Sequence, residues 1–134
     1  MTNRATLEAL LARVMEGEGW DAKLNADIAV TLGGWQRKWH DSERPHGWYW
    51  RRGDYSWTAE GEGYPSNYLG SLDAALTLVP EGWRYDLSSG DLLEKPAARL
   101  TPDCASPHFE GYAQTVPRAL IAACLKARME ALGE

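Results

Sequence analysis

The sequence has only two cysteines, Cys104 and Cys124, and this scarcity excludes several classes of small protein. Two cysteines that lie so far apart do not build a disulfide framework, and the lack of a CxxC pair argues against the common zinc and redox sites. We therefore expect reduced thiols, as is usual for proteins of the cytoplasm.

Long apolar runs are also missing from the chain. No stretch approaches the roughly 20 apolar residues that a membrane-spanning helix needs. The stretch 1–20 mixes acidic residues into its apolar pattern, and it therefore does not resemble a secretory signal peptide. We expect a cytoplasmic protein with no membrane partner.

The local signatures of common enzymes are absent too. No GxxxxGK, GxGxxG, GxSxG or HExxH run occurs, so phosphate-binding loops, dinucleotide folds, hydrolases and zinc proteases lack their usual motifs. Four residues of zinc-ligand type lack the usual spacing of about two to four residues between paired ligands: His40, His46, Cys104 and His108. We therefore expect no catalytic residues, no metal and no cofactor.

Length and charge limit the remaining possibilities. The 134 residues fit a single domain, 1–134, which should bury about two-thirds of its unfolded surface. The formal net charge of −5 argues against duplex nucleic acid as a partner, because neutralising phosphates drives that binding. A local basic site for a small anion stays possible.

The stretch 34–59 concentrates what the rest of the chain lacks. It holds five of the seven tryptophans, and five basic residues against three acidic residues, in a chain that is otherwise acidic. Indole rings can stack on a flat ligand, and arginine pairs with phosphate or carboxylate through two hydrogen bonds. The simpler alternative is that the tryptophans fill a hydrophobic core, because large aromatic residues dominate core burial.

Alternation along this stretch predicts strands at 35–39 and 48–51, joined by a polar loop. Trp35, Arg37 and Trp39 should then share one strand face. With a second clamp from Arg51 or Arg52 and a following loop that carries two tyrosines, this region is our candidate ligand site. Its predicted residues are Trp35, Arg37, Trp39, Trp48, Trp50, Arg51, Arg52, Tyr64 and Tyr68.

The remaining pattern predicts helices on both sides of this stretch and a second group of strands. Apolar residues at helical spacing indicate a first helix through 7–14 and further helices after Asp21, after Ser71 and from Thr115 or Val116 onward. Alternation indicates strands at 83–87 and 108–114. Between them, Pro96 should confine the segment up to Leu100 to an edge strand or an irregular arm.

This order of elements predicts an α+β fold. Hairpin turns favour an antiparallel sheet, and helices with broad apolar stripes are best buried against strands rich in large aromatic residues. We expect an α-β-α layered sandwich in which a mostly antiparallel sheet is covered by helices.

Two segments resemble a known family. Residues 71–83, SLDAALTLVPEGW, are similar to the central motif of the phage ABA sandwich domain family. Residues 115–127, TVPRALIAACLKA, are similar to its closing helix, and the resemblance lies mainly in 68–83 and 115–128. It implies an α-β-α layered fold and a bacteriophage origin, and it brings no catalytic residues. The tryptophan-rich middle departs from the family pattern.

These observations favour binding over catalysis. The first hypothesis is a small phage-encoded protein in the cytoplasm of an infected bacterium, such as a sponge that sequesters a nucleotide-derived immune signal and so counters host defence. The second is an accessory module that binds a host or virion protein, because Trp, Tyr and Arg also dominate protein hot spots. The third is an enzyme that degrades such a signal. So many tryptophans in one segment also predict a homodimer or higher oligomer.

Overall fold

The computed structural model describes residues 3–17, 21–40, 47–52, 55–56, 67–90, 95–102 and 108–132, with side chains for all of these except 37–40, 47–52 and 55–56. Within these residues, no helix is both long enough and apolar enough to cross a bilayer.

The chain opens with two helices whose beginnings follow from their capping residues. Helix α1 spans Arg4–Glu16, and the Asn3 side chain accepts a hydrogen bond from the amide of Thr6. Helix α2 spans Ala22–Thr31, and the Asp21 carboxylate accepts one from the amide of Leu24. Such caps satisfy amides of the first turn that have no partner within the helix. After α2 the chain turns at Gly34, whose φ of 77° favours glycine.

The other two helices are also capped by hydroxyl side chains. Helix α3 spans Leu72–Leu76 behind Ser71, and the chain leaves it in a turn over residues 77–78. Helix α4 spans Val116–Ala131 behind Thr115 and has Pro117 in its first turn, where proline is tolerated. Of the four helices that the structure describes, α4 is the most buried, with ten buried residues.

Within the described residues, six strands form two separate antiparallel sheets. Strands β1 (Trp35–His40), β2 (Gly47–Arg52) and β3 (Tyr55–Ser56) pair in the order β1-β2-β3. Strands β4 (Arg84–Ser88), β5 (Ala97–Thr101) and β6 (Phe109–Tyr112) pair in the order β4-β5-β6. The first strand pair and the last strand follow the predicted ranges closely.

The prediction for the segment around Pro96 was wrong. Strand β5 begins directly after Pro96 and is the central strand of its sheet, not an edge strand or an irregular arm. Proline cannot donate to a ladder, but Pro96 stands before the strand and uses only its carbonyl, which accepts from the amide of Ala113. The donor that proline lacks is therefore not needed.

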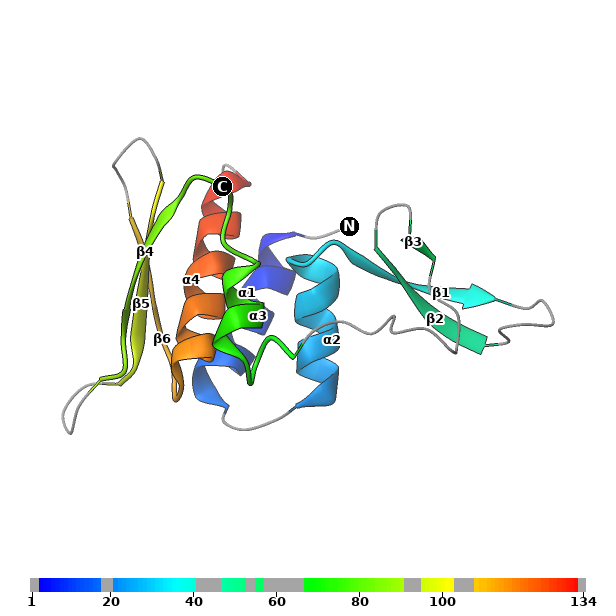
Figure 1. Ribbon diagram of the computed structural model, residues 1–134, viewed down its shortest axis with the longest axis horizontal. Helices are drawn as coiled ribbons and strands as arrows, with labels where there is room; N and C mark the ends of the chain where they lie inside the picture. The colour runs from blue at the N-terminus through cyan, green and yellow to red at the C-terminus, as the bar shows by residue number, and fades with distance from the viewer. Residues whose placement is uncertain are drawn as a thin grey trace.

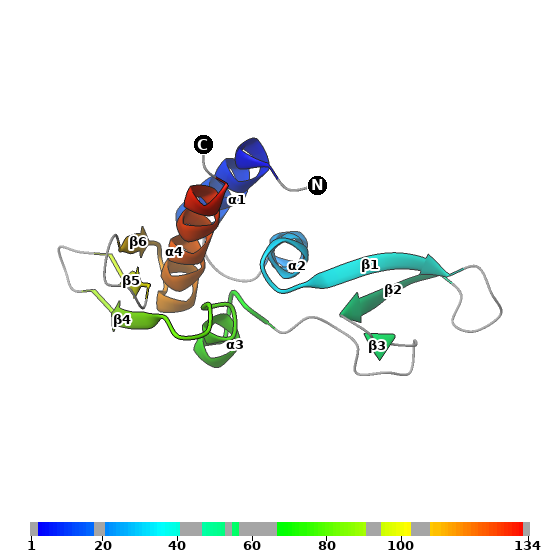
Figure 2. The ribbon, with the colours of Figure 1, turned by 90° about the horizontal axis from the view of Figure 1, so that it is seen from above.

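The helices lie between the two sheets. Helix α4 packs along the sheet β4–β6, with α1 and α3 against it, and α2 lies between α1 and β1. In both views the sheet β1–β3 is on the far side of α2 from the sheet β4–β6 (Figures 1 and 2). The α+β class and the antiparallel pairing are therefore confirmed. The order of the layers is sheet, helices, sheet. An α-β-α sandwich has a different order, in which a sheet lies between two layers of helices.

Alternation within the sheet β4–β6 explains why helices cover only one of its faces. Ala98 and Leu100 of β5 are buried against α4, together with Gly111 of β6, whereas Arg99 and Tyr112 are exposed on the other face. Helix and sheet approach closely at Gly111, since a Cβ there would lie 2.2 Å from the carbonyl oxygen of Ala119. A polar outer face gains little from a second helical layer.

Candidate functional site

The pairing of β1 with β2 determines which predicted site residues share a face. Trp35 lies opposite Arg52, Arg37 opposite Trp50, and Trp39 opposite Trp48. Residues directly opposite each other in an antiparallel pair are on the same face of the sheet. One face of the ladder therefore has four tryptophan and two arginine positions. Each of the two arginine positions lies opposite a tryptophan, and the third pair consists of two tryptophans. We call these six positions the Trp/Arg face.

The opposite face of the same ladder has a different composition. Lys38 lies opposite Tyr49, and Gln36 lies opposite Arg51. Arg51 was predicted as an alternative to Arg52 for a second clamp, and the register separates the two onto opposite faces. Strands β1 and β2 contain no acidic residue, and each face of the ladder has two Lys or Arg positions.

Trp35 links the Trp/Arg face to the hydrophobic core. It is 7% exposed, and its indole Nε1 donates to the hydroxyl of Tyr68 over 3.1 Å. Tyr68 is 1% exposed. These two residues, both predicted to bind a ligand, therefore contact each other in the hydrophobic core, at the end of the ladder nearest the helices. Tyr64, the other predicted tyrosine, lies outside the described residues.

A buried asparagine holds the Tyr68 segment in place. The Asn25 side-chain oxygen accepts from the amides of Tyr68 and Leu69 over 2.8 and 3.3 Å. Asn25 is on α2, which leads into β1, so the same helix positions both the strand and the segment that packs on its first tryptophan. A buried amide with two backbone partners is satisfied and contributes to a unique arrangement.

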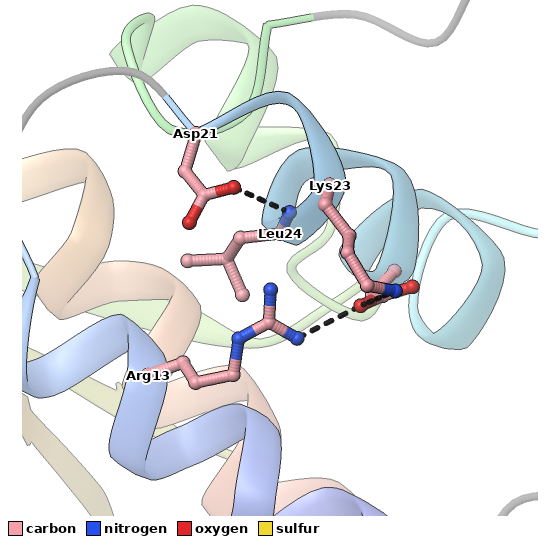
Figure 3. A network of polar contacts seen from close by, with 5 residues as sticks. Arg13, Asp21, Lys23 and Leu24 are labelled. Carbon is pink, nitrogen blue, oxygen red and sulfur yellow. Dashed lines mark hydrogen bonds and ion pairs between the residues drawn. The ribbon is translucent and has the colours of Figure 1, made fainter.

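An ion pair joins α2 to α1 on the other side. Arg13 Nη1 donates to Asp27 Oδ2 over 2.8 Å, and Lys23 Nζ is 3.7 Å from the same oxygen. Figure 3 shows this contact beside the capping bond from Leu24 to Asp21. The Arg13 and Asp27 side chains are more than a third exposed, so the pair orients α2 more than it stabilises the fold.

The ladder beyond Trp35 extends away from the helices. Both ribbon views show β1 and β2 running outward from α2 (Figures 1 and 2). Among the described helices, α2 makes the main contact with β1. We call β1 and β2 together the arm, because they continue past the body that anchors their first residue pair.

Neither a metal-binding cluster nor a reactive thiol is found among the described residues. No group of three His, Cys, Asp or Glu side chains within them could hold a metal ion. Cys124 is 4% exposed, and burial raises the pKa of its thiol to about 12, which leaves it protonated and unreactive near neutral pH. His46 and Cys104, considered as zinc ligands above, lie outside the described residues.

Two hollows on the outer face of the sheet β4–β6 were missed by sequence reasoning. One, of about 290 Å³, is lined by residues that include Asp86, Arg99, Glu110 and Tyr112. The other, of about 520 Å³, is lined by Trp83, Arg84, Tyr85, Asp86, Arg99, Thr101 and His108. Alternation of charged residues in 84–88 and 97–101 was the available signal, but their convergence depends on a strand register that the sequence does not state.

Comparison of the chain with protein-family models, with curated proteins and with solved structures gives no match to any of them. The resemblance to the phage ABA sandwich domain family therefore stays a prediction.

Proposed function

We propose that the protein is a non-enzymatic binding protein whose Trp/Arg face holds a flat, anionic, nucleotide-like ligand. The observation that carries the proposal is the register of the arm, which puts Trp35 opposite Arg52, Arg37 opposite Trp50 and Trp39 opposite Trp48.

Cross-strand spacing suits a ligand with a ring and a phosphate. Cβ atoms of opposite residues in an antiparallel pair are about 4.5–5.5 Å apart, and same-face neighbours along a strand are about 7 Å apart. A nucleobase that stacks on one indole therefore has a guanidinium within reach of its phosphate. Stacking contributes roughly 1–3 kcal/mol per base, and arginine pairs with phosphate through two hydrogen bonds.

The arm and the body divide these roles. Trp35 and Tyr68 bond to each other in the core and fix the root of the arm. The remaining positions, Arg37, Trp39, Trp48, Trp50 and Arg52, are the ones we assign to the ligand. The ligand class is a nucleotide-derived signal, and in the phage setting that the resemblance implies, its sequestration would counter host defence.

A protein partner is the second candidate, and the outward course of the arm favours it. The arm leaves the body, and β1 is an edge strand of the described sheet β1-β2-β3. Tryptophan, tyrosine and arginine are the residues that most often anchor protein interfaces. In this alternative the same positions contact a host or virion protein.

Titration calorimetry against a panel of cyclic dinucleotides, ADP-ribose derivatives and mononucleotides tests the first candidate. We expect one class to bind, with Arg37→Ala reducing its affinity by at least about tenfold, the effect of losing one good hydrogen bond to a charged group. Lys38→Ala, on the opposite face of the ladder, is the control and should bind as the unaltered chain does. If the folded protein binds no compound of the panel, the nucleotide-ligand proposal is excluded and the protein-partner proposal is favoured.

We also propose that the protein forms a homodimer, because the arm concentrates large apolar residues outside the helical body. Most homo-oligomers are two-fold symmetric, and binding sites often form where subunits meet. Analytical ultracentrifugation at micromolar concentration should give twice the mass of the chain. If only a species of monomer mass is found across the concentration range, the dimer proposal is excluded, whereas the proposal of a ligand on the Trp/Arg face is unchanged.

A further inference from the structure

The outer face of the sheet β4–β6 is built as cross-strand rows. Pairing places Arg84 beside Thr101, and Asp86 beside Arg99, which in turn pairs with Glu110. The β5–β6 register, continued by one residue, brings His108 next to Thr101. This face is turned away from α4 (Figure 1). Most of the residues that line the two hollows are on it.

The row through Arg99 is satisfied by its own members. Arg99 donates from Nε and Nη2 to Glu110 Oε2 over 3.2 and 3.0 Å, and the Tyr112 hydroxyl donates to Glu110 Oε1 over 3.2 Å. The hydrogen bonds from Arg99 hold the pKa of the Glu110 carboxyl below its usual value. Arg99 therefore has a carboxylate on β6 and another, Asp86, beside it on β4.

The neighbouring row is chemically different. The side chains of Arg84, Thr101 and His108 make no hydrogen bond or ion pair with any other residue that the structure describes. All three line the hollow of about 520 Å³, and the acid that also lines it, Asp86, belongs to the other row, where it lies beside Arg99. A guanidinium, a hydroxyl and an imidazole thus stand in a row across three strands, with Trp83 and Tyr85 lining the same hollow.

We propose that this row is a second binding site, separate from the arm, and that it takes the phosphate group of a phosphate monoester. Arg84 supplies a fork of N–H donors that matches a tetrahedral oxyanion, and Thr101 and His108 supply single donors beside it. Thr101 lies on the central strand, so its hydroxyl is held between the two other donors. An aromatic or apolar ester group would lie along Trp83, whose ring stacks on Phe109 with centroids 5.9 Å apart.

A metal cation does not fit this row. Its arginine repels cations, and no described group of three acidic, His or Cys side chains could coordinate one. A phosphate uses all three groups in their donor capacity and leaves the Arg99–Glu110 pair intact. The ligand chemistry is therefore that of an oxyanion.

The probes that test the site are inorganic phosphate and phenyl phosphate, followed by two-dimensional amide NMR at constant ionic strength with chloride as the reference salt. We expect saturable shifts confined to the amides around 84, 101 and 108, and tighter binding of phenyl phosphate than of inorganic phosphate. Arg84→Ala should weaken phenyl phosphate binding by at least about tenfold, as expected for the loss of a charge-assisted hydrogen bond. His108→Ala should weaken it as well.

Arg128→Ala is the matched control, because Arg128 is an exposed arginine on α4, away from the outer face of the sheet. It should leave the titration unchanged. Arg84 and His108 are exposed, so their variants should keep a folded spectrum, which the same experiment reports directly. Equal responses of the Arg84 and Arg128 variants, shifts spread over many surface cations, or no saturable shift would each overturn the site.

Discussion

Arg118 is a buried charged residue that joins two helices. It is 2% exposed in the first turn of α4, and its Nη1 donates to the carbonyl oxygens of Arg13 and Val14 over 3.3 and 3.2 Å. These carbonyls belong to the last turn of α1, which carries partial negative charge, and the Arg13 carbonyl also accepts from the amide of Gly17. The guanidinium therefore satisfies the end of one helix from the beginning of another.

Replacing Arg118 by Met should remove this link while keeping much of its volume. We expect Arg118→Met to lower the free energy of unfolding by about 1.5–3 kcal/mol, the usual value for hydrogen bonds to a charged group. Arg128→Met, an exposed position on the same helix, should change it by less than about 0.5 kcal/mol. Urea denaturation of the two variants makes the comparison, and equal stabilities would contradict the bonding role of Arg118.

Cys124 gives a second residue-scale prediction, based on its burial in α4. Its pKa rises from 9.0 to about 12 because burial disfavours the thiolate. In a Cys104→Ser chain at pH 8, a thiol reagent such as DTNB should therefore react with Cys124 only when denaturant unfolds the protein. Rapid reaction of the folded chain would contradict the assignment, and Cys124→Ala identifies the contribution of Cys104.

The raised pKa of Cys124 also predicts the direction in which the stability of the fold changes with pH. Because the folded pKa is above the unfolded one, the neutral thiol contributes stability that is fully present below pH 9 and is lost as pH rises toward 12. The alkaline loss of stability should accordingly be smaller in Cys124→Ala than in the unaltered chain.

At the scale of elements, the packing of β6 on α4 depends on the absence of a side chain at Gly111. A Cβ there would lie 2.2 Å from the Ala119 carbonyl oxygen and 2.5 Å from the Ala123 amide nitrogen, both of them backbone atoms that cannot move alone. Gly111→Ala should therefore separate strand and helix and destabilise the fold by on the order of 1–3 kcal/mol or more.

Thermal denaturation provides the test of Gly111, with Gly34→Ala as its comparison. At Gly34 a Cβ meets nothing within 4 Å, and the cost is limited to a positive φ of 77°, about 1–2 kcal/mol. Gly111→Ala should have the lower melting temperature. The reverse order would show that the sheet tolerates displacement from α4.

Elements whose signals are local were predicted well from the sequence. Asp21, Ser71 and Thr115 each cap the helix that follows, because a capping bond joins residues three apart. The position of Pro96 was misjudged because the central place of β5 is decided by pairing with β4 and β6 on either side. The spacing of residues in the sequence predicts local hydrogen bonds such as helix caps, but it does not determine the order of strands in a sheet.

The candidate site shows the same division. Alternation correctly put positions 35, 37 and 39 on one face, but the partner positions on β2 came only from the register. The bond between Trp35 and Tyr68 joins residues 33 apart, and nothing local in the sequence distinguishes that core tryptophan from those farther along the arm. The core alternative thus applies to Trp35, and the ligand site stays a proposal for the tryptophans farther along the arm.

At the scale of the whole molecule, the account rests on a division between a helical body and an arm. The body holds the buried core and fixes the arm through α2, Asn25 and the Trp35–Tyr68 bond. The arm has cationic and aromatic positions and no acid in its strands, within a chain of net charge −5. A local basic surface on an acidic protein favours a small anionic ligand over duplex nucleic acid.

The most direct test of this account compares two neighbouring arginines that the register puts on opposite faces. Arg52 lies opposite Trp35 on the Trp/Arg face, whereas Arg51 lies opposite Gln36 on the other. Titration calorimetry of Arg52→Ala and Arg51→Ala with a cyclic dinucleotide and with ADP-ribose, at equal ionic strength, separates a specific face from general positive charge. The account predicts that Arg52→Ala loses at least about tenfold in affinity while Arg51→Ala binds as the unaltered chain does. Equal losses in the two variants, or binding that neither affects, would contradict it.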